Sequence, residues 1–206
     1  MSPEAFVVAC HPFTFVSHET LDKLKIYVEL LHKWQSKINL VSASTLGDVW
    51  QRHIFDSAQL LHYIRAEDRV VDFGSGAGFP AMVLSLMGVQ QVTVIESDQR
   101  KIAFLQEVAR QTQSSVVLIN KRIEQVDPFS VDVITARAFA SLSDILDHAS
   151  GWWQPATKGV FLKGKNVKEE LTAAQAKWHI KFQCDRSCAD PDGSVLIIEE
   201  VKALSV

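Results

Sequence analysis

The sequence predicts an α/β protein with a mostly parallel sheet of seven strands, a helical cap before it and an antiparallel hairpin at its end. From residue 69 onward, short apolar segments alternate with helical patterns, which is typical of a parallel sheet covered by helices on both faces. Before residue 67 the apolar residues recur only at helical spacing. After residue 178, two apolar segments follow each other with only a turn between them, which favours a hairpin.

The first 66 residues are predicted to form a helical cap or extension, followed by one compact domain over 67–206. Between positions 21 and 38, apolar residues recur at steps of three and four, as on one face of an amphipathic helix. They are Leu21, Leu24, Val28, Leu31, Trp34 and Ile38. A second helical stretch is predicted over 46–64.

The parallel strands are expected at 69–73, 91–96, 115–120, 131–136 and 159–163, with helices at 80–87, 99–111, 142–153 and 167–178. Pro80 suits the start of a helix, because its missing N–H would have no partner there. Two further strands are expected at 179–184 and 194–201, and D-P-D-G at 190–193 predicts the turn between them.

The composition is that of a globular protein, with 206 residues of which 47% are hydrophobic and 22% charged. No apolar run approaches the roughly 20 residues that span a bilayer, and no basic segment precedes the short apolar run near the N-terminus, so neither a membrane helix nor a secretory signal is expected. The three cysteines, an odd number without a second pair at metal spacing, predict free thiols and a cytoplasmic protein. With a net charge of −3, binding to nucleic acid requires a local basic face.

A glycine-rich turn, D-F-G-S-G-A-G at 72–78, joins the first strand to an apolar helical segment. Such a turn brings backbone N–H groups close to a ligand with no Cβ in the way. A dinucleotide-binding fingerprint would place its third glycine at position 79, where Phe79 stands. The D-x-G-x-G-x-G spacing instead resembles motif I of class I methyltransferases, which bind S-adenosylmethionine.

The remaining ligand contacts are expected where the other strands end, because ligands of open parallel sheets lie beyond the carboxyl ends of the strands. Glu96 ends the second strand 18 residues after Gly78, where an acid commonly binds ribose hydroxyls. Ile123 and Glu124 follow the third strand and would border the adenine ring. Arg137 ends the fourth strand and could hold a methionine carboxylate or a phosphate through a forked pair of bonds. A solvated surface position is the alternative for each of these side chains.

Several segments, in order along nearly the whole chain, carry a closer resemblance. They are V-V-D-F-G-S-G-A-G-F-P at 70–80, R-A-F-A-S-L at 137–142, R-H-I-F-D-S at 52–57, N-L at 39–40 and F-L-K-G at 161–164. Together they resemble the glucose-inhibited division protein B family, bacterial enzymes that methylate N7 of a guanosine in 16S ribosomal RNA. The match is weak from residue 177 onward. It also departs from the family at Ala77, where proline is frequent, and at Glu96, where aspartate is common.

This resemblance implies S-adenosyl-L-methionine as the cofactor, 16S ribosomal RNA or a small ribosomal subunit as the partner, no membrane, and a monomer. It places cofactor contacts on Gly74, Phe79, Ile123, Glu124 and Arg137. With the motif and strand-end residues, the expected cofactor site is Asp72, Gly74, Gly76, Gly78, Phe79, Glu96, Ile123, Glu124 and Arg137. Guanine N7 has a free lone pair and no proton, so in-line transfer needs no general base. We therefore assign no catalytic acid or base, and we expect no metal.

Basic residues near the strand ends and helix starts predict an RNA-facing patch, with scattered solvated side chains as the alternative. The predicted substrate contacts are Arg100, Lys101, Arg122, Lys163 and Lys165, with Lys121 and Lys168 nearby. His53 and Asp56 lie three apart on one helical face, and we interpret them as a buried hydrogen-bonded pair that ties the cap to the sheet. A general-base pair is the alternative interpretation.

Two other functions stay open at this stage. One is a methyltransferase that acts on another RNA, a protein or a small molecule. The other is a noncatalytic module that binds an adenosine nucleotide. The intact D-x-G-x-G-x-G turn, together with Glu96 and Arg137, argues against a site that has lost its function.

Overall fold

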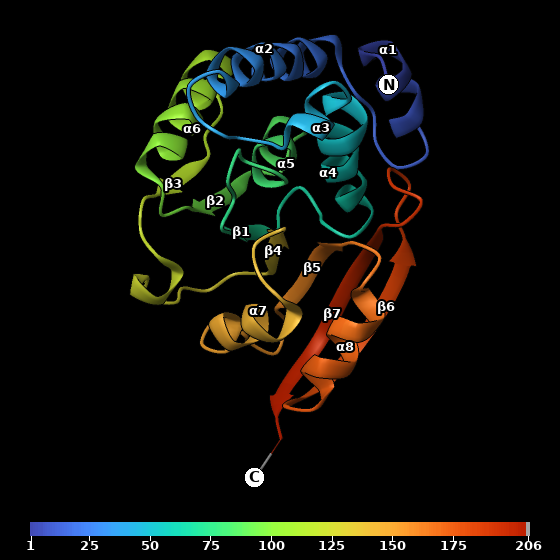
Figure 1. The fold of residues 1–206 in the computed structure, drawn as a ribbon, viewed down its shortest axis with the longest axis vertical. Helices are drawn as coiled ribbons and strands as arrows, with labels where there is room; N and C mark the ends of the chain where they lie inside the picture. Colours follow the sequence, from blue (N-terminus) through green and yellow to red (C-terminus); the bar gives the residue numbers. More distant parts are fainter. Residues whose placement is uncertain (205–206) are drawn as a thin grey trace.

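The protein, as a computed structural model that describes residues 1–204, folds around one sheet (Figure 1). Within this part of the chain the sheet has seven strands in the order β3-β2-β1-β4-β5-β7-β6. The five strands β1 to β5 run parallel to one another, and β7 runs antiparallel to both β5 and β6. The prediction of a mostly parallel α/β sheet that ends in an antiparallel hairpin is confirmed.

The strands agree with the predicted ones apart from their ends. They are β1 Arg69–Phe73, β2 Gln91–Ile95, β3 Val117–Ile119, β4 Val133–Arg137, β5 Lys158–Lys163, β6 Trp178–Arg186 and β7 Ser194–Ala203. The third strand is half as long as predicted, because β3 lies at the edge of the sheet and pairs only with β2. The hairpin strands are longer than predicted, because each pairs with the other over its whole length.

The helical elements differ more from the prediction. They are α1 Pro3–Cys10, α2 His18–Gln35, α3 Ala43–Leu46, η1 Trp50–Phe55, α4 Asp56–Ala58, η2 Gln59–His62, α5 Ala81–Leu86, α6 Gln99–Thr112, η3 Ile123–Gln125, α7 Leu142–Ala149 and α8 Val167–Gln175. The prediction missed α1, which begins at a Ser2 cap that accepts a hydrogen bond from the Ala5 amide. The single helix predicted over 46–64 is instead divided, with a π-helical segment at η1. No helix in residues 1–204 has both the length and the apolar character needed to cross a bilayer.

Two hydrophobic cores lie on opposite faces of the sheet, because successive strand residues point to opposite sides. Val70 packs with the cap helices, α5 and α6 on one face, and Val71 packs with α7 and α8 on the other. Figure 1 shows α2 and α6 on one side of the sheet and α7 and α8 on the other.

The cap contacts the glycine-rich turn directly. The hydroxyl of Tyr27, in α2, donates a hydrogen bond of 2.5 Å to the carbonyl oxygen of Ala77, and its ring stacks on Phe79 at a centroid distance of 5.2 Å. Cap residues and sheet residues therefore share one core, which fixes the cap beside the turn. The division of the chain at residue 66 stays a prediction.

Candidate cofactor and substrate site

The glycine-rich turn after β1 needs glycine for its backbone shape and for space. Gly74, Gly76 and Gly78 have φ values of 63°, 58° and 96°, in the region that other residues rarely adopt. A Cβ added to Gly78 would lie 2.6 Å from a methyl carbon of Leu105, and one added to Gly74 would lie 2.1 Å from the Phe139 ring. The turn therefore presents its backbone at the edge of the sheet with neighbouring side chains packed closely against it.

Glu96, directly after β2, fixes this turn from the other side. Its side chain is 7% exposed, and its Oε2 accepts a hydrogen bond of 2.8 Å from the Gly76 amide. Its Oε1 accepts a second bond, of 2.7 Å, from the Asp98 amide at the start of α6. Each carboxylate oxygen has a further lone pair, so the carboxylate can still accept bonds from ribose hydroxyls. That role stays a prediction.

A cavity of about 270 Å³ opens beside the turn where the loops after β1 to β4 converge. Its lining includes six residues expected from the sequence: Gly74, Glu96, Lys101, Arg122, Ile123 and Glu124. It also includes Phe139, which the sequence analysis did not assign to the site although it lies in the R-A-F-A-S-L segment. The predicted residues after the first three strands thus surround one cavity, whereas Arg137 lines another cavity, and Gly76, Gly78 and Phe79 line neither.

Asp72 lies beneath the turn and outside this cavity. It is fully buried, its Oδ1 accepts a bond of 2.7 Å from the Thr135 hydroxyl, and its Oδ2 has no hydrogen-bond partner. Burial raises the pKa of Asp72 to about 7, while bonds from Ser75 and Thr135 oppose that shift. The structure therefore bonds the Asp72 carboxyl group to β4 and does not bring it to the cavity.

The raised pKa of Asp72 predicts a pH-dependent stability. The unfolded chain releases this proton near pH 4, whereas the folded protein keeps it to about pH 7. Between these values the folded state binds more protons than the unfolded chain. The free energy of unfolding therefore falls as the pH rises through this window, by at most about 1.4 kcal/mol per pH unit, and the contribution of Asp72 is constant above it. Asp72→Asn, which stays neutral, should lack this decline.

Urea unfolding of the ligand-free parent and of Asp72→Asn at pH 5 and pH 8 measures this difference. The exposed Asp127→Asn controls for the loss of a carboxylate. Parallel stability profiles for the parent and Asp72→Asn would show that Asp72 ionises normally in the fold.

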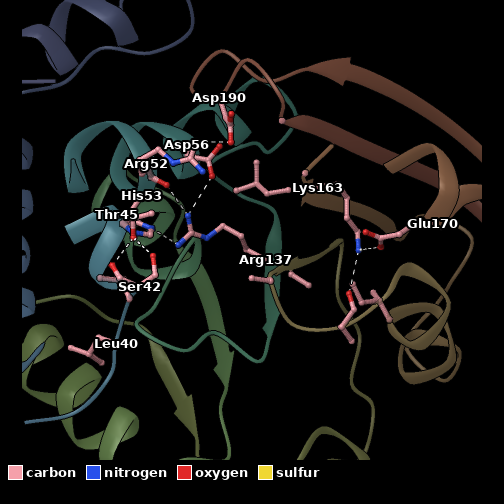
Figure 2. Close-up of a pocket in the computed structure, with 18 residues that line it drawn as sticks. Leu40, Ser42, Thr45, Arg52, His53, Asp56, Arg137, Lys163, Glu170 and Asp190 are labelled. Carbon is pink, nitrogen blue, oxygen red and sulfur yellow. Dashed lines mark hydrogen bonds and ion pairs between the residues drawn. The ribbon is translucent and has the colours of Figure 1, made fainter. Parts of the chain in front are cut away.

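Arg137 extends from the end of β4 toward the cap (Figure 2). Its Nη1 donates to the carbonyl oxygen of Arg52 at 2.9 Å and to Asp56 Oδ2 at 3.3 Å, and its Nη2 lies 2.6 Å from His53 Nδ1. The guanidinium carbon lies 5.0 Å above the centre of the Phe79 ring, and the side chain is 17% exposed. The surface-cation alternative is therefore wrong. The forked grip on a carboxylate or phosphate stays a prediction, since both terminal nitrogens contact the cap here.

His53 has a defined protonation state. An arginine can only donate, so Nδ1 of His53 accepts from Arg137, and Nε2 carries the proton that is donated to Thr45 Oγ1 at 2.9 Å. Burial, followed by the charges of Arg137 and Arg52, lowers the pKa of His53 to about 3. Within residues 1–204, His53 and Asp56 do not bond to each other as expected. Each instead bonds to the guanidinium of Arg137, which belongs to β4.

A larger cavity, of about 470 Å³, lies on the other side of β4 (Figure 2). Ala138, whose φ is 50°, lines both cavities, so the two lie next to each other at this residue. The cap forms one wall of the larger cavity, and the ends of β4 and β5, α8 and the final hairpin form the rest. Its polar and charged lining includes Thr45, Arg52, His53, Asp56, Arg137, Lys163, Glu170 and Asp190.

The other predicted basic residues are not brought together. The side chain of Lys163 is 6% exposed, and its Nζ lies 2.7 Å from Glu170 Oε2, so it belongs to the larger cavity and not to an exposed patch. Arg100 is exposed but paired with Asp98 at 2.9 Å. Lys165 is exposed and lines neither cavity. Of the five predicted substrate contacts, Lys101 and Arg122 line the smaller cavity, and Arg100 and Lys101 line a separate one beside residues 35–39.

Comparison with known proteins places this site in context. A family model described as GidB, rRNA small subunit methyltransferase G, matches residues 20–190. A "Ribosomal RNA small subunit methyltransferase G" from Rhodospirillum rubrum is 47% identical and covers 98% of both chains. A relative of the same name from Paramagnetospirillum magneticum is 49% identical and covers 90% of this chain and 91% of its own. Among solved structures, M. jannaschii TYW2 in complex with AdoMet shares the fold, with a TM-score of 0.56, 14% identity, and coverage of 82% of this chain and 80% of its own.

Proposed function

The chain belongs to the GidB family, rRNA small subunit methyltransferase G, and on this basis we propose that it methylates N7 of a guanosine in 16S ribosomal RNA. Its family makes it an S-adenosylmethionine-dependent rRNA methyltransferase. The acceptor atom, the choice between bare RNA and an assembled small subunit, and a monomeric state in the cytoplasm are parts of the proposal. The observation that carries it is the pair of cavities that lie next to each other at Ala138.

The smaller cavity fits the adenosine part of S-adenosylmethionine. Gly74 lines this cavity, and its lack of a Cβ lets the Phe139 ring, which also lines the cavity, pack against the turn. Two backbone amides hold the Glu96 carboxylate in place, and each of its oxygens keeps one lone pair that can accept from a ribose hydroxyl. Ile123 supplies an apolar surface where an adenine ring would lie. When bound, the cofactor supplies an activated methyl group on a positively charged sulfur. Ala138 and the neighbouring end of β4 would hold that group where the two cavities lie next to each other.

The larger cavity fits a nucleobase taken out of its stack. Guanine N7 offers a lone pair without a proton, so the protein needs to align the base and exclude water and does not need to remove a proton. His53 is suited to positioning in this site, since its low pKa and its two hydrogen bonds keep it neutral. Methylation leaves a positive charge on the base, which the carboxylates of Asp56 and Glu170 would stabilise.

The RNA backbone would approach over the rim of the smaller cavity. Lys101, Lys121 and Arg122 line this rim, and they are the basic side chains best placed to contact phosphates. Binding should weaken as salt rises, because each phosphate contact releases counterions.

Transfer of labelled methyl from S-adenosylmethionine to unmethylated 16S rRNA and to small ribosomal subunits tests this function. We expect the label in one guanosine, with strand cleavage there after mild reduction and aniline treatment, because N7-methylated guanosine is unusually labile to this chemistry. Reactions without enzyme and with excess S-adenosylhomocysteine serve as controls. Label found only in methylated amines, in C5-methylated pyrimidines or in ribose would refute the assignment to N7.

A further inference from the structure

Besides Arg137 and Asp56, two further ion pairs line the larger cavity and join different elements (Figure 2). Arg52 and Asp190 are 2.6 Å apart and join η1 to the loop before β7, with side chains that are 42% and 24% exposed. Lys163 and Glu170 are 2.7 Å apart and join the end of β5 to α8, with side chains that are 6% and 28% exposed. Lys163 is therefore the charged side chain that has lost most of its contact with water, and its partner Glu170 stays partly exposed.

Lys163 and Glu170 are held by further bonds that leave part of each group available. Glu170 Oε2 accepts from Lys163 and, at 2.8 Å, from the Leu142 amide at the start of α7. No protein donor within residues 1–204 bonds to the second oxygen, Oε1. The Lys163 ammonium has three N–H donors, of which Glu170 and the carbonyl oxygen of Ala140 take two. One acceptor oxygen of Glu170 and one N–H donor of Lys163 thus remain without a protein partner within residues 1–204, at an ion pair whose lysine is buried and whose glutamate is partly exposed.

We propose that Glu170 and Lys163 read the Watson–Crick edge of the target guanine, an inference that rests on the function proposed above. That edge carries two donors, N1–H and the N2 amino group, beside one acceptor, O6. A carboxylate beside an ammonium matches this order, with the free Oε1 of Glu170 accepting from N1–H and the amino group through its two lone pairs and Lys163 donating to O6. Adenine presents an acceptor at N1 and an amino group at position 6, so the same pair of groups rejects it.

Burial makes this reading selective. A buried polar group without a hydrogen-bond partner is destabilised by the full free energy of its desolvation. A site that bonds a substrate group therefore discriminates strongly against an analogue that lacks this group. This applies most strongly to Lys163, whose side chain is 6% exposed, whereas Glu170, at 28%, and the Arg52–Asp190 pair keep more contact with water. The negative charge of the Glu170 carboxylate would also stabilise the positive charge that N7 methylation leaves on the base.

Replacing the target guanosine by inosine tests the proposal, because inosine lacks only the N2 amino group. The position is first located by the aniline cleavage described above, and 16S rRNA with inosine there is made by ligation and assembled into small subunits. For the parent enzyme we expect kcat/KM for methyl transfer to fall about 10-fold to 100-fold with inosine. In Glu170→Gln, guanosine itself should react more slowly, and the guanosine-to-inosine ratio should shrink at least about threefold.

Lys163→Met is the matched control, since it breaks the same ion pair while guanosine and inosine both keep O6. It should slow both substrates equally and leave the ratio at its parental value. Glu169→Gln, at an exposed position next to Glu170 in α8, should leave both rates unchanged.

Two results would overturn the proposal. One is a parent enzyme that methylates inosine with the same kcat/KM as guanosine. This result does not depend on whether any variant folds. The other is a Glu170→Gln enzyme that slows both substrates by the same factor, which would make Glu170 only a support for Lys163 and α7. In either case N7-methylated guanosine would still form, so the proposed function would stand. No methyl transfer by the parent to any RNA would overturn both.

Discussion

Replacing Arg137 by alanine should lower the free energy of unfolding by about 3–5 kcal/mol, because removing one partner of a buried ion pair leaves an uncompensated charge. Asp56 would lose its guanidinium partner, and the carbonyl oxygen of Arg52 and His53 Nδ1 would each lose a donor. The cap wall of the larger cavity would then be free to move from the end of β4. We therefore also expect methyl transfer to be lost, and urea unfolding together with a transfer assay measures both effects.

Arg137→Lys separates the effect of the positive charge from the effect of the planar shape of the guanidinium. If Arg137 only held the carboxylate or phosphate expected from the sequence, this change would reduce activity while the melting temperature of the ligand-free protein stayed near the parental value. The structure revises that expectation, because a lysine keeps the charge but cannot reach His53, Asp56 and the Arg52 carbonyl at once. The ligand-free melting temperature should therefore fall as well.

Arg69→Lys is the control for this pair of variants. Arg69 makes a comparable forked pair with Asp132 at the opposite end of β1, away from both cavities. It should leave the affinity for S-adenosylhomocysteine unchanged. An Arg137→Lys protein with parental melting but weak stabilisation by S-adenosylhomocysteine would restore the original role, a grip on the cofactor that folding does not need.

Glu96→Ala should weaken binding of S-adenosylhomocysteine about 10-fold to 100-fold, as expected when a charged hydrogen-bond acceptor is lost. The carboxylate would contribute in two ways. It bonds ribose in the proposed complex, and it already holds the Gly76 amide of the turn and the Asp98 amide of α6 in place. Isothermal titration calorimetry measures the loss.

Glu96→Gln helps to divide these contributions. A glutamine keeps one acceptor oxygen, so it can hold one of the two amides, and its affinity should fall between those of the parent and the alanine variant. Glu107→Gln, on α6 and outside both cavities, should bind like the parent. Parental affinity in Glu96→Ala would remove Glu96 from the cofactor site.

Much of the fold and of the smaller cavity could be predicted because the relevant patterns are local. Alternating strands and helices in the chain define a parallel sheet, and in such a sheet the carboxyl ends of neighbouring strands meet at one edge. Gly74, Glu96 and Ile123 each follow a different strand, and they were expected together for this reason. The turn was recognisable from its glycines, because positive φ values and close packing against the backbone both require a residue without a Cβ.

The larger cavity depends on contacts that local patterns do not encode. Arg137 meets His53 from 84 positions away, and the segment between them contains most of the sheet. The burial of Lys163 depends on where α8 places Glu170, so a lysine that looks solvated in the sequence becomes a desolvated partner. Pairing of charges and hydrogen-bond donors depends on distance in space, whereas periodicity and turn chemistry depend on neighbours in the chain. The amino-acid order therefore defined the sheet, the turn and the residues around the smaller cavity, and the packing of the cap against β4 defined which groups face the larger one.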